Sequence, residues 1–457
     1  MKHLKTIFVA WLVLTGASLW SQVESVPAQP EQAASDNSGD TSNPDSSGVR
    51  MQAPPPVNGQ SYPIVLTSQE RSNYLRGGLA FTSAYTDNAI GPVAGHPVSD
   101  ISYSVAPMVA LDQTTPREHL VLTYAPGFTF YQRTSARNET DQNALIDFQW
   151  RLSPHVTFSA GDSFQKSSNV FNQPDLAANG GVSGGAEGGN FSVIAPVADR
   201  LSNAGNAGLT YQFSLNGMIG GSGTFFNLHY PDPAQVPGLG DSSSQAGLAF
   251  YSLRVSRVHY LGVTYEYQRL LAYPTAGTNE TQTHAAFLFY TVYPAKGFSI
   301  SLFGGPQRSE TVQASSLPVL WQWKPAGGAS LGWQGRLNSF ALSYVHIISA
   351  GGGLAGAVQM DSGNASIRQQ FTKTLSASVN GGYTQNNVLG ASTAGLASGH
   401  SISGTASLLQ QFGQHLALQL GYTRVHQDYS GVAVLAVPNT NREFVSFSYQ
   451  FAKPLGR

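Results

Sequence analysis

Histidine and cysteine are the first residue types to examine for chemistry, because they supply most catalytic bases and metal ligands. The histidines show no paired metal-ligand spacing, as five of their positions illustrate: His155, His229, His284, His346 and His415. The chain has no cysteine, which excludes disulfides, thiolate zinc sites and iron–sulfur clusters. A Gly-rich run, NGGVSGGAEGGN at 179–190, lacks the Lys and Ser/Thr of a phosphate-binding loop. We therefore expect no metal and no cofactor.

Charged side chains are the remaining candidates, and they make up only 11% of the chain. Eight of them fall on the polar face of alternating segments: Arg76, Asp112, Asp147, Arg151, Arg254, Glu266, Asp361 and Arg368. A ring of one sign would indicate selectivity for ions, whereas this sparse mixture of signs indicates local fields acting on neutral or weakly selected solutes. An equally good interpretation is that each forms an ion pair stiffening a wall, or lies in a rim.

The elements that carry these charges have the period of two that is typical of β-strands. In EFVSFSYQF, at 443–451, Val445, Phe447, Tyr449 and Phe451 alternate with small polar residues. The same alternation recurs from about Asn73 onward, and no sustained helical spacing appears. A soluble sandwich would turn the apolar face inward, and a barrel in a bilayer would turn it outward. The low content of charged residues favours the bilayer. A net charge of -1 argues against nucleic acid and against an anionic membrane surface as electrostatic partners.

The connections alternate between tight links and long Gly-, Asp-, Asn- and Pro-rich loops. Short links include Ser153–His155 and Arg336–Asn338, and the longest loop spans about 167–205. Short turns on one rim and long loops on the other are typical of membrane barrels. The segments number about 18, in a range of about 16–20, and an even count places both chain ends on one side. The fold class is therefore all-β: a transmembrane antiparallel up-and-down β-barrel with short periplasmic turns and long extracellular loops.

Two N-terminal segments that differ in composition precede this pattern. Residues 1–21 combine Lys2, His3 and Lys5 with a short apolar run and then small residues, as secretory signal peptides do. Residues 22–72 are rich in Ser, Pro, Asp, Asn and Gln, so we expect a disordered periplasmic tail. Residues 73–457 are expected to form the barrel. Tyr85, Tyr131, Tyr230 and other aromatic residues near strand ends could form the interfacial girdles.

The last strand carries a resemblance to a known class. The alternating residues Val445, Phe447, Tyr449 and Phe451 resemble the C-terminal signal strand of Gram-negative outer-membrane β-barrel proteins, although AKPLGR follows here. The resemblance implies a porin-like protein in the cell outer membrane, with membrane lipid and the barrel-insertion machinery as partners. Because trimers are common in this class, the resemblance also makes a homo-oligomer a candidate assembly for this chain.

The expected lumen face consists of small neutral polar residues such as Thr123, Ser159, Ser378 and Ser446, which leave an aqueous channel in a barrel this wide. The long loop is too long for a simple hairpin connection. We expect it either to fold into the lumen as a constriction or to remain outside as a cap. In the first case the narrowest point would lie near Asp175, Glu187, Asp199 and Arg200.

The expected function is passive diffusion of small, mostly neutral solutes. Two alternatives stay open: an export conduit for polysaccharide with periplasmic partners, and a structural or adhesive barrel plugged by its tail or by the long loop. A His/Ser pair on the outer face, such as His284 with Ser252, would suggest an enzyme, but both are as easily lumen residues. We therefore expect no enzymatic activity.

Overall fold

The structure is a computed structural model that describes residues 72–89, 97–167, 193, 199–274, 277–313, 319–390, 398–430 and 439–455. It contains β1 (Ser72–Thr86), β2 (Asp100–Thr114), β3 (Glu118–Tyr131), β4 (Glu139–Arg151), β5 (Val156–Ser167), β6 (Arg200–Tyr211), β7 (Gly217–His229), β8 (Asp241–Arg254), β9 (His259–Tyr273), β10 (Asn279–Ala295), β11 (Phe298–Val312), β12 (Leu320–Gln334), β13 (Asn338–Ser349), β14 (Val358–Gln370), β15 (Leu375–Val388), β16 (Ser398–Phe412), β17 (Leu416–Tyr429) and β18 (Asn439–Pro454). Two 3-10 turns lie in loops, η1 (Ser135–Arg137) and η3 (Pro233–Gln235). Within the part of the chain that the structure describes, no helix is long and apolar enough to cross a membrane.

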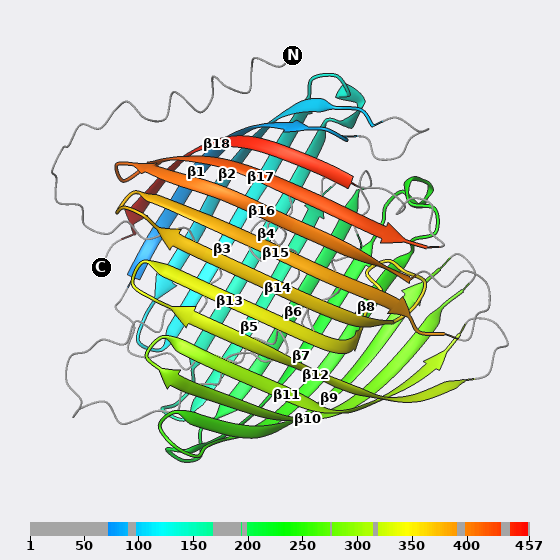
Figure 1. The fold of residues 1–457 in the computed structure, drawn as a ribbon. Helices are drawn as coiled ribbons and strands as arrows, with labels where there is room; N and C mark the ends of the chain where they lie inside the picture. Colours follow the sequence, from blue (N-terminus) through cyan, green and yellow to red (C-terminus); the bar gives the residue numbers. More distant parts are fainter. Residues whose placement is uncertain are drawn as a thin grey trace. The chain divides into compact units, whose positions relative to one another are not determined.

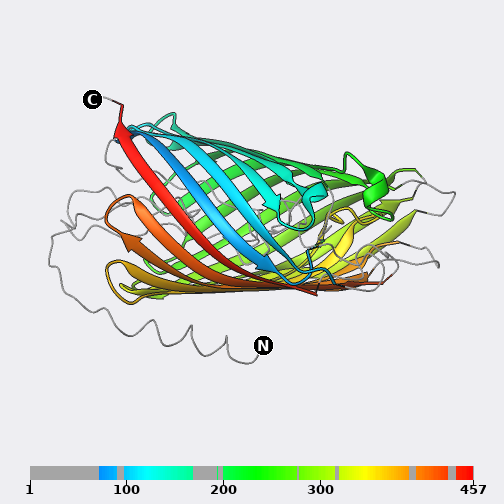
Figure 2. The same cartoon turned by 90° about the horizontal axis from the view of Figure 1, so that it is seen from above.

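The eighteen strands form one antiparallel sheet that closes on itself. Each strand pairs with its neighbours in sequence, and β1 also pairs with β18, with Phe81 opposite Phe447 and Leu79 opposite Tyr449. In both views the blue β1 lies beside the red β18, and the strands wind obliquely around the barrel (Figures 1 and 2). Closure leaves no free sheet edge at the two ends of the meander. The sequence-based expectations of an antiparallel barrel and of 18 strands are confirmed.

Large apolar side chains face outward along the barrel and are exposed. Leu79, Leu288, Val379 and Phe447 are examples, and Leu288 is 62% exposed. A water-soluble protein would bury such a surface, whereas hydrocarbon solvates it. The apolar face of the sheet therefore points outward, as it does in a transmembrane barrel. This decides between the soluble sandwich and the membrane barrel, which the alternation of residues alone could not distinguish.

The aromatic residues near strand ends divide between the two faces. Tyr85, Tyr103, Trp150, Trp333 and Tyr449 are exposed on the outside, between 40% and 47%. Tyr230 and Tyr429 are buried in the interior, and the alternation of β3 places Tyr131 inward. The expectation that Tyr131 and Tyr230 belong to a girdle is wrong, because Tyr131 lies on the inward face and Tyr230 lies in a loop that packs inside.

Shorter and longer connections alternate between the two ends of the barrel. One end, here called the turn rim, has links of two to five residues, such as 296–297 between β10 and β11 and 212–216 between β6 and β7. The other end, the loop rim, has connections of five residues or more, of which 274–278 between β9 and β10 is the shortest. The two-residue link depends on Gly297, whose φ is +75° and whose absent Cβ would lie 2.3 Å from the carbonyl oxygen of Gln334.

Candidate functional site

The candidate site is the inner wall of the barrel. In the half nearest the turn rim, β3, β5, β13, β15, β16 and β18 carry inward side chains that are small, polar and only partly buried: Thr123, Ser159, Ser343, Ser378, Ser407, Ser446 and Ser448. On β7, β8 and β9 the inward side chains Met218, Phe250 and Tyr260 are instead buried in an apolar cluster. The small polar side chains hydrogen-bond across strands, as between the hydroxyls of Ser378 and Ser407 at 2.9 Å and from Thr82 to Ser446 at 2.9 Å. These pairs give the polar groups of the wall hydrogen-bond partners without using charged residues, so the wall can face water.

The expected lumen charges lie at separate places on this wall. Arg76 and Asp112 face inward on β1 and β2 and form an ion pair of 2.7 Å with side chains 25% and 17% exposed. Asp147 and Arg151 lie on the inward face of β4, where Asp147 is opposite Val121 and Arg151 is opposite Thr157. Arg368 lies inward on β14, opposite Ser378.

Glu266 lies at the middle of the inward face of β9. Leu248 is its neighbour on β8 and Ala285 its neighbour on β10. Its side chain is 2% exposed, and within the described residues its Oε1 atom has no hydrogen-bond partner. The carboxyl therefore lies in an apolar environment rather than at an open pore surface.

Asp361 faces outward, so the expectation that it lies in the lumen is wrong. It shares its face with Ile367, which is 50% exposed, and it lies opposite His346 on β13. Its Oδ1 atom is 2.6 Å from Nδ1 of His346 and accepts a hydrogen bond of 2.7 Å from the hydroxyl of Tyr344. The residues that follow Asp361 (Ser362, Gly363, Asn364) are small and show no alternation of apolar and polar side chains. The face on which Asp361 lies could therefore not be predicted from the sequence of β14 alone.

Several inward charges were missed by the sequence reasoning. Lys324 lies inward on β12, and Arg442, Glu139 and Asp141 lie inward near the loop rim. Arg442 and Asp141 are buried, at 7% and 2% exposed. The alternation of β18 could have revealed Arg442, since it has the parity of Ser446 and Ser448.

The inward charges of the described strands nearly cancel. The basic ones are Arg76, Arg151, Arg200, Arg254, Lys324, Arg368 and Arg442, and the acidic ones are Asp100, Asp112, Glu139, Asp141, Asp147 and Glu266. Seven against six leaves a formal excess of one positive charge. Such a wall favours neither ion sign strongly.

Near the loop rim the interior is filled rather than open. Inward residues of many strands are buried there: Ser102, Thr129, Ser167, Ser202, Thr384, Asn386, Gln427 and Thr440. Part of the filling is an interior apolar cluster, which consists of Val193, Phe226, Leu228, Tyr230, Val236, Leu239, Ala285, Phe287, Phe289, Phe303, Ala326, Val345, Ile347, Leu354, Val358, Met360 and Tyr429. The expectation of a lumen face dominated by small polar residues is wrong for this region, because loop residues pack against large apolar side chains of the wall.

Val193 is the residue that the structure describes within 168–198 of the long loop, and its contacts indicate where this part of the loop packs. Its side chain is 0% exposed and belongs to the interior apolar cluster. Asp199 lies 3.8 Å from Lys166, and Arg200 faces inward at 5% exposed. Asp175 and Glu187, which the sequence placed at the constriction, lie outside the described residues, as do residues 1–71.

Tyr230 belongs to the loop between β7 and β8, and it packs into the interior apolar cluster at 1% exposed. Burial raises the pKa of its hydroxyl to about 12, with the carboxylate of Asp241 adding to the rise and Arg200 opposing it. The backbone N–H of Gly240 in the same loop donates to the carbonyl of Gly353 at 2.8 Å. Two connections of the loop rim therefore contact each other across the mouth.

Nothing in the described residues assembles a catalytic or metal constellation. No group of three His, Asp or Glu residues in the described part could hold a metal ion. His284 is exposed on the outer face, whereas Ser252 faces inward at 0% exposed, so this pair cannot act together. The outward His346 has Asp361 at one ring nitrogen and the amide of Gln359 at the other, at 3.1 Å, where a nucleophilic hydroxyl would be needed.

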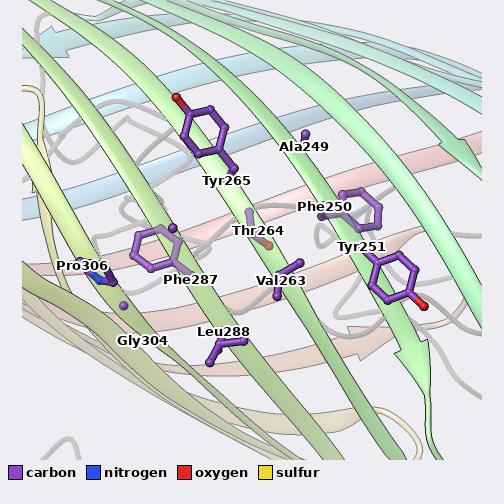
Figure 3. A pocket seen from close by; sticks show the side chains of 12 residues that line it. Ala249, Phe250, Tyr251, Val263, Thr264, Tyr265, Phe287, Leu288, Gly304 and Pro306 are labelled. Carbon is purple, nitrogen blue, oxygen red and sulfur yellow. The ribbon is translucent and has the colours of Figure 1, made fainter.

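The outer face of β8–β11 carries a hollow of about 460 Å³. Figure 3 shows Tyr251, Val263, Tyr265, Leu288 and Pro306 around it. The hollow exists because Ala249, Ala286 and Gly304 are small and leave space between the larger side chains. The lining has no His, Asp or Glu, so the hollow has the character of a membrane-facing surface rather than of a reaction site.

The fold and the wall define a class of architecture: a closed transmembrane β-barrel of the kind found in outer-membrane porins. The sequence matches no protein-family model and no curated protein.

Solved structures with a similar outline include three outer-membrane proteins. They are OpdK of Pseudomonas aeruginosa (12% identity, TM-score 0.40, covering 83% of this chain and 99% of that one), OccAB4 of Acinetobacter baumannii (10%, 0.40, 84% and 100%) and the siderophore receptor PirA of P. aeruginosa (9%, 0.42, 84% and 81%). The class of fold rests on the strand register and on the outward apolar face described above.

Proposed function

We propose that the protein is an outer-membrane channel through which small, mostly neutral solutes diffuse passively. The observation that carries the proposal is the partly exposed wall of Ser and Thr near the turn rim, inside a closed barrel whose inward charges nearly cancel. Small uncharged polar side chains hydrate a lumen without trapping a charged solute. Export to the outer membrane is part of the proposal, and it depends on a signal peptide at 1–21.

Single-channel conductance of the chain from residue 22 in a planar lipid bilayer tests this function. Stable conductance steps, with a reversal potential close to zero in a salt gradient, are the expected result because the inward charges balance. A folded barrel that never conducts would overturn the channel function.

A plugged barrel is the second candidate, and the burial of inward side chains near the loop rim favours it. The position of Val193 supports the proposal that the long loop narrows the lumen, with Asp199 and Arg200 near the narrow part. The export conduit gains no support from the described residues, since the predicted tail at 22–72 lies outside them except for Ser72, which begins β1.

Substitution at Val193 separates a constricted channel from a plugged one. Val193→Asp places a carboxylate among apolar side chains, which costs several kcal/mol and should displace the segment from the wall. A conducting protein whose conductance rises in this variant has a constriction there, and a silent protein that begins to conduct has a plug. Val193→Leu is the matched control, because it keeps the contact apolar. Equal conductance of Val193→Asp and wild type would exclude both roles for this segment.

A further inference from the structure

The ladder between β12 and β13 stops short of the loop rim. It has eight residue pairs, from Gly327 opposite His346 to Gln334 opposite Ser339, whereas the other ladders of the described strands have at least ten. Both strands continue beyond this point. Residues 320–326 of β12 pair with β11 on one side and, among the described residues, have no ladder partner on the β13 side.

The missing partner has bent into the barrel. The hairpin end, defined here as residues 347–360, joins β13 to β14, and all its residues except Ala355 are buried. The backbone N–H of Ile348 donates at 3.1 Å to the side-chain oxygen of Gln307, which faces inward on β11. A strand in the wall could not reach that oxygen across β12. The hairpin end therefore lies inside the wall.

Apolar side chains close the resulting seam, which we define as the line between residues 320–326 and the hairpin end. Ala326 and Phe303 on one side and Val345 and Ile347 on the other belong to the interior apolar cluster, and all four are at most 8% exposed. Pro325, in the unpaired edge, has no N–H to leave without an acceptor. The seam is thus held by apolar packing in place of backbone hydrogen bonds.

Aromatic side chains place the seam at the membrane interface. Trp321 and Trp323, on the outward face of the unpaired edge, are 52% and 70% exposed. Tryptophan concentrates at the boundary between hydrocarbon and headgroups, where water can satisfy unpaired backbone groups. The outer opening of the seam therefore lies beside the lipid leaflet at the loop rim, and its inner side borders the filled part of the lumen.

An opening of this kind would cost little for a suitable solute. Parting two hydrogen-bonded strands breaks a row of backbone bonds, which hydrocarbon cannot replace. Parting the seam breaks side-chain contacts but no backbone ladder, and an apolar solute replaces the contacts of Ala326 and Ile347 as it enters, while Gln322 and Lys324 also face inward along the edge. A strongly hydrated solute makes no apolar contacts there, so the seam favours apolar and amphipathic molecules.

We propose that the seam between β12 and the hairpin end is a lateral passage through which small apolar or amphipathic molecules move between the lumen and the adjacent membrane leaflet. The passage rests on the proposed channel function and deepens it, by adding a class of solute and a second exit from the lumen. Hydrophilic solutes would still follow the axis of the barrel.

A reversible disulfide tests the passage, and the absence of native cysteine makes it clean. If the ladder continued past Gly327 and His346, Ala326 would face Ile347, so Ala326→Cys with Ile347→Cys staples the seam shut. The matched control is Thr291→Cys with Ser301→Cys, a pair opposite each other in the β10–β11 ladder and outside the seam. The readout is uptake of the apolar dye N-phenyl-1-naphthylamine by Gram-negative cells that express the full chain, with ionic conductance of the purified protein measured alongside.

Oxidation of the seam pair should slow dye uptake about tenfold, which corresponds to about 1.4 kcal/mol of barrier, while reductant restores it. The control pair should not respond to oxidation, and ionic conductance should stay the same in both. Dye uptake that is unchanged by a formed disulfide would overturn the passage.

If the disulfide does not form, Ala326→Cys alone is labelled with N-(1-pyrenyl)maleimide, whose bulk fills the inner side of the seam. Slower dye uptake then supports the passage, and unchanged uptake overturns it. Absence of ionic conductance together with redox-sensitive dye uptake would refute the axial channel and still support the lateral passage, so the two proposals can fail separately.

Discussion

The backbone N–H of Ile348 donates to the side chain of Gln307 at 3.1 Å, although β13 and β11 are not neighbours in the sheet. The bond bypasses β12 and is possible only because the hairpin end leaves the wall. It also satisfies a buried donor that would otherwise have no acceptor. The inward bend of one hairpin therefore creates both the filled loop-rim region and the seam beside it.

Gln307→Leu should loosen the hairpin end without unfolding the barrel. The substitution leaves the N–H of Ile348 buried without an acceptor, which costs about 1–3 kcal/mol. Hydrogen exchange should become faster for residues 347–360 and stay unchanged for the strands of the barrel. Gln322→Leu is the control, since the side-chain oxygen of Gln322 has no hydrogen-bond partner among the described residues. Equal exchange in the two variants would show that the Gln307 bond does not retain the hairpin.

Arg76 and Asp112 should tune ion preference in opposite directions. Arg76→Gln removes one positive charge from the wall and should shift permeability toward cations, whereas Asp112→Asn removes one negative charge and should shift it toward anions. The expected change in the permeability ratio is about two- to fivefold, because the pair is hydrated and a single charge contributes about 1 kcal/mol in water. Reversal potentials in a salt gradient measure it. Arg308→Gln, on the outer face over Trp321, should leave the ratio unchanged.

Phe451 should be needed for efficient assembly of the barrel. Its ring covers Gly77 across the β1–β18 closure, where an added Cβ on Gly77 would lie 2.4 Å from the ring. Phe451→Ala removes this cover and an outward apolar side chain worth about 1.5–3 kcal/mol, and it shortens the aromatic pattern of the proposed insertion signal. The fraction of heat-modifiable protein on SDS gels should fall. Ser448→Ala, inward on the same strand, should assemble normally, and equal assembly of both variants would remove Phe451 from the signal.

The loop between β7 and β8 should loosen at alkaline pH through Tyr230. Because burial raises the pKa of this hydroxyl from 10.0 to about 12, the neutral form stabilises the folded loop. That stability is complete below pH 10 and is lost as the pH rises through about 12, by about 2–3 kcal/mol in all. Limited proteolysis of residues 230–240 between pH 9 and pH 12 should show the transition. Tyr230→Phe keeps the ring without the ionisable group, so cleavage that remains equally pH-dependent in this variant would assign the effect elsewhere.

The class of fold, and the face on which most side chains lie, follow from local patterns in the amino-acid sequence. A period of two with large apolar residues on one side is a local property of each strand, as in Val445, Phe447, Tyr449 and Phe451. Contact with hydrocarbon stabilises the apolar face of each strand separately. The alternation of short and long connections then determined the antiparallel order and the strand count.

At other positions the alternation does not indicate the direction of a side chain, and contacts between segments far apart in the sequence set that direction. Asp361 lies outward because its register follows Tyr344 and His346 on the neighbouring strand, which its own small neighbours do not reveal. Phe226, Phe289 and Met360 lie inward because loop residues and Val193 cover them, so an apolar side chain can face the interior as well as the lipid. The seam at β12 depends on a hairpin that bends away from its partner, and pairing between strands is a property of two chain segments that no single segment encodes.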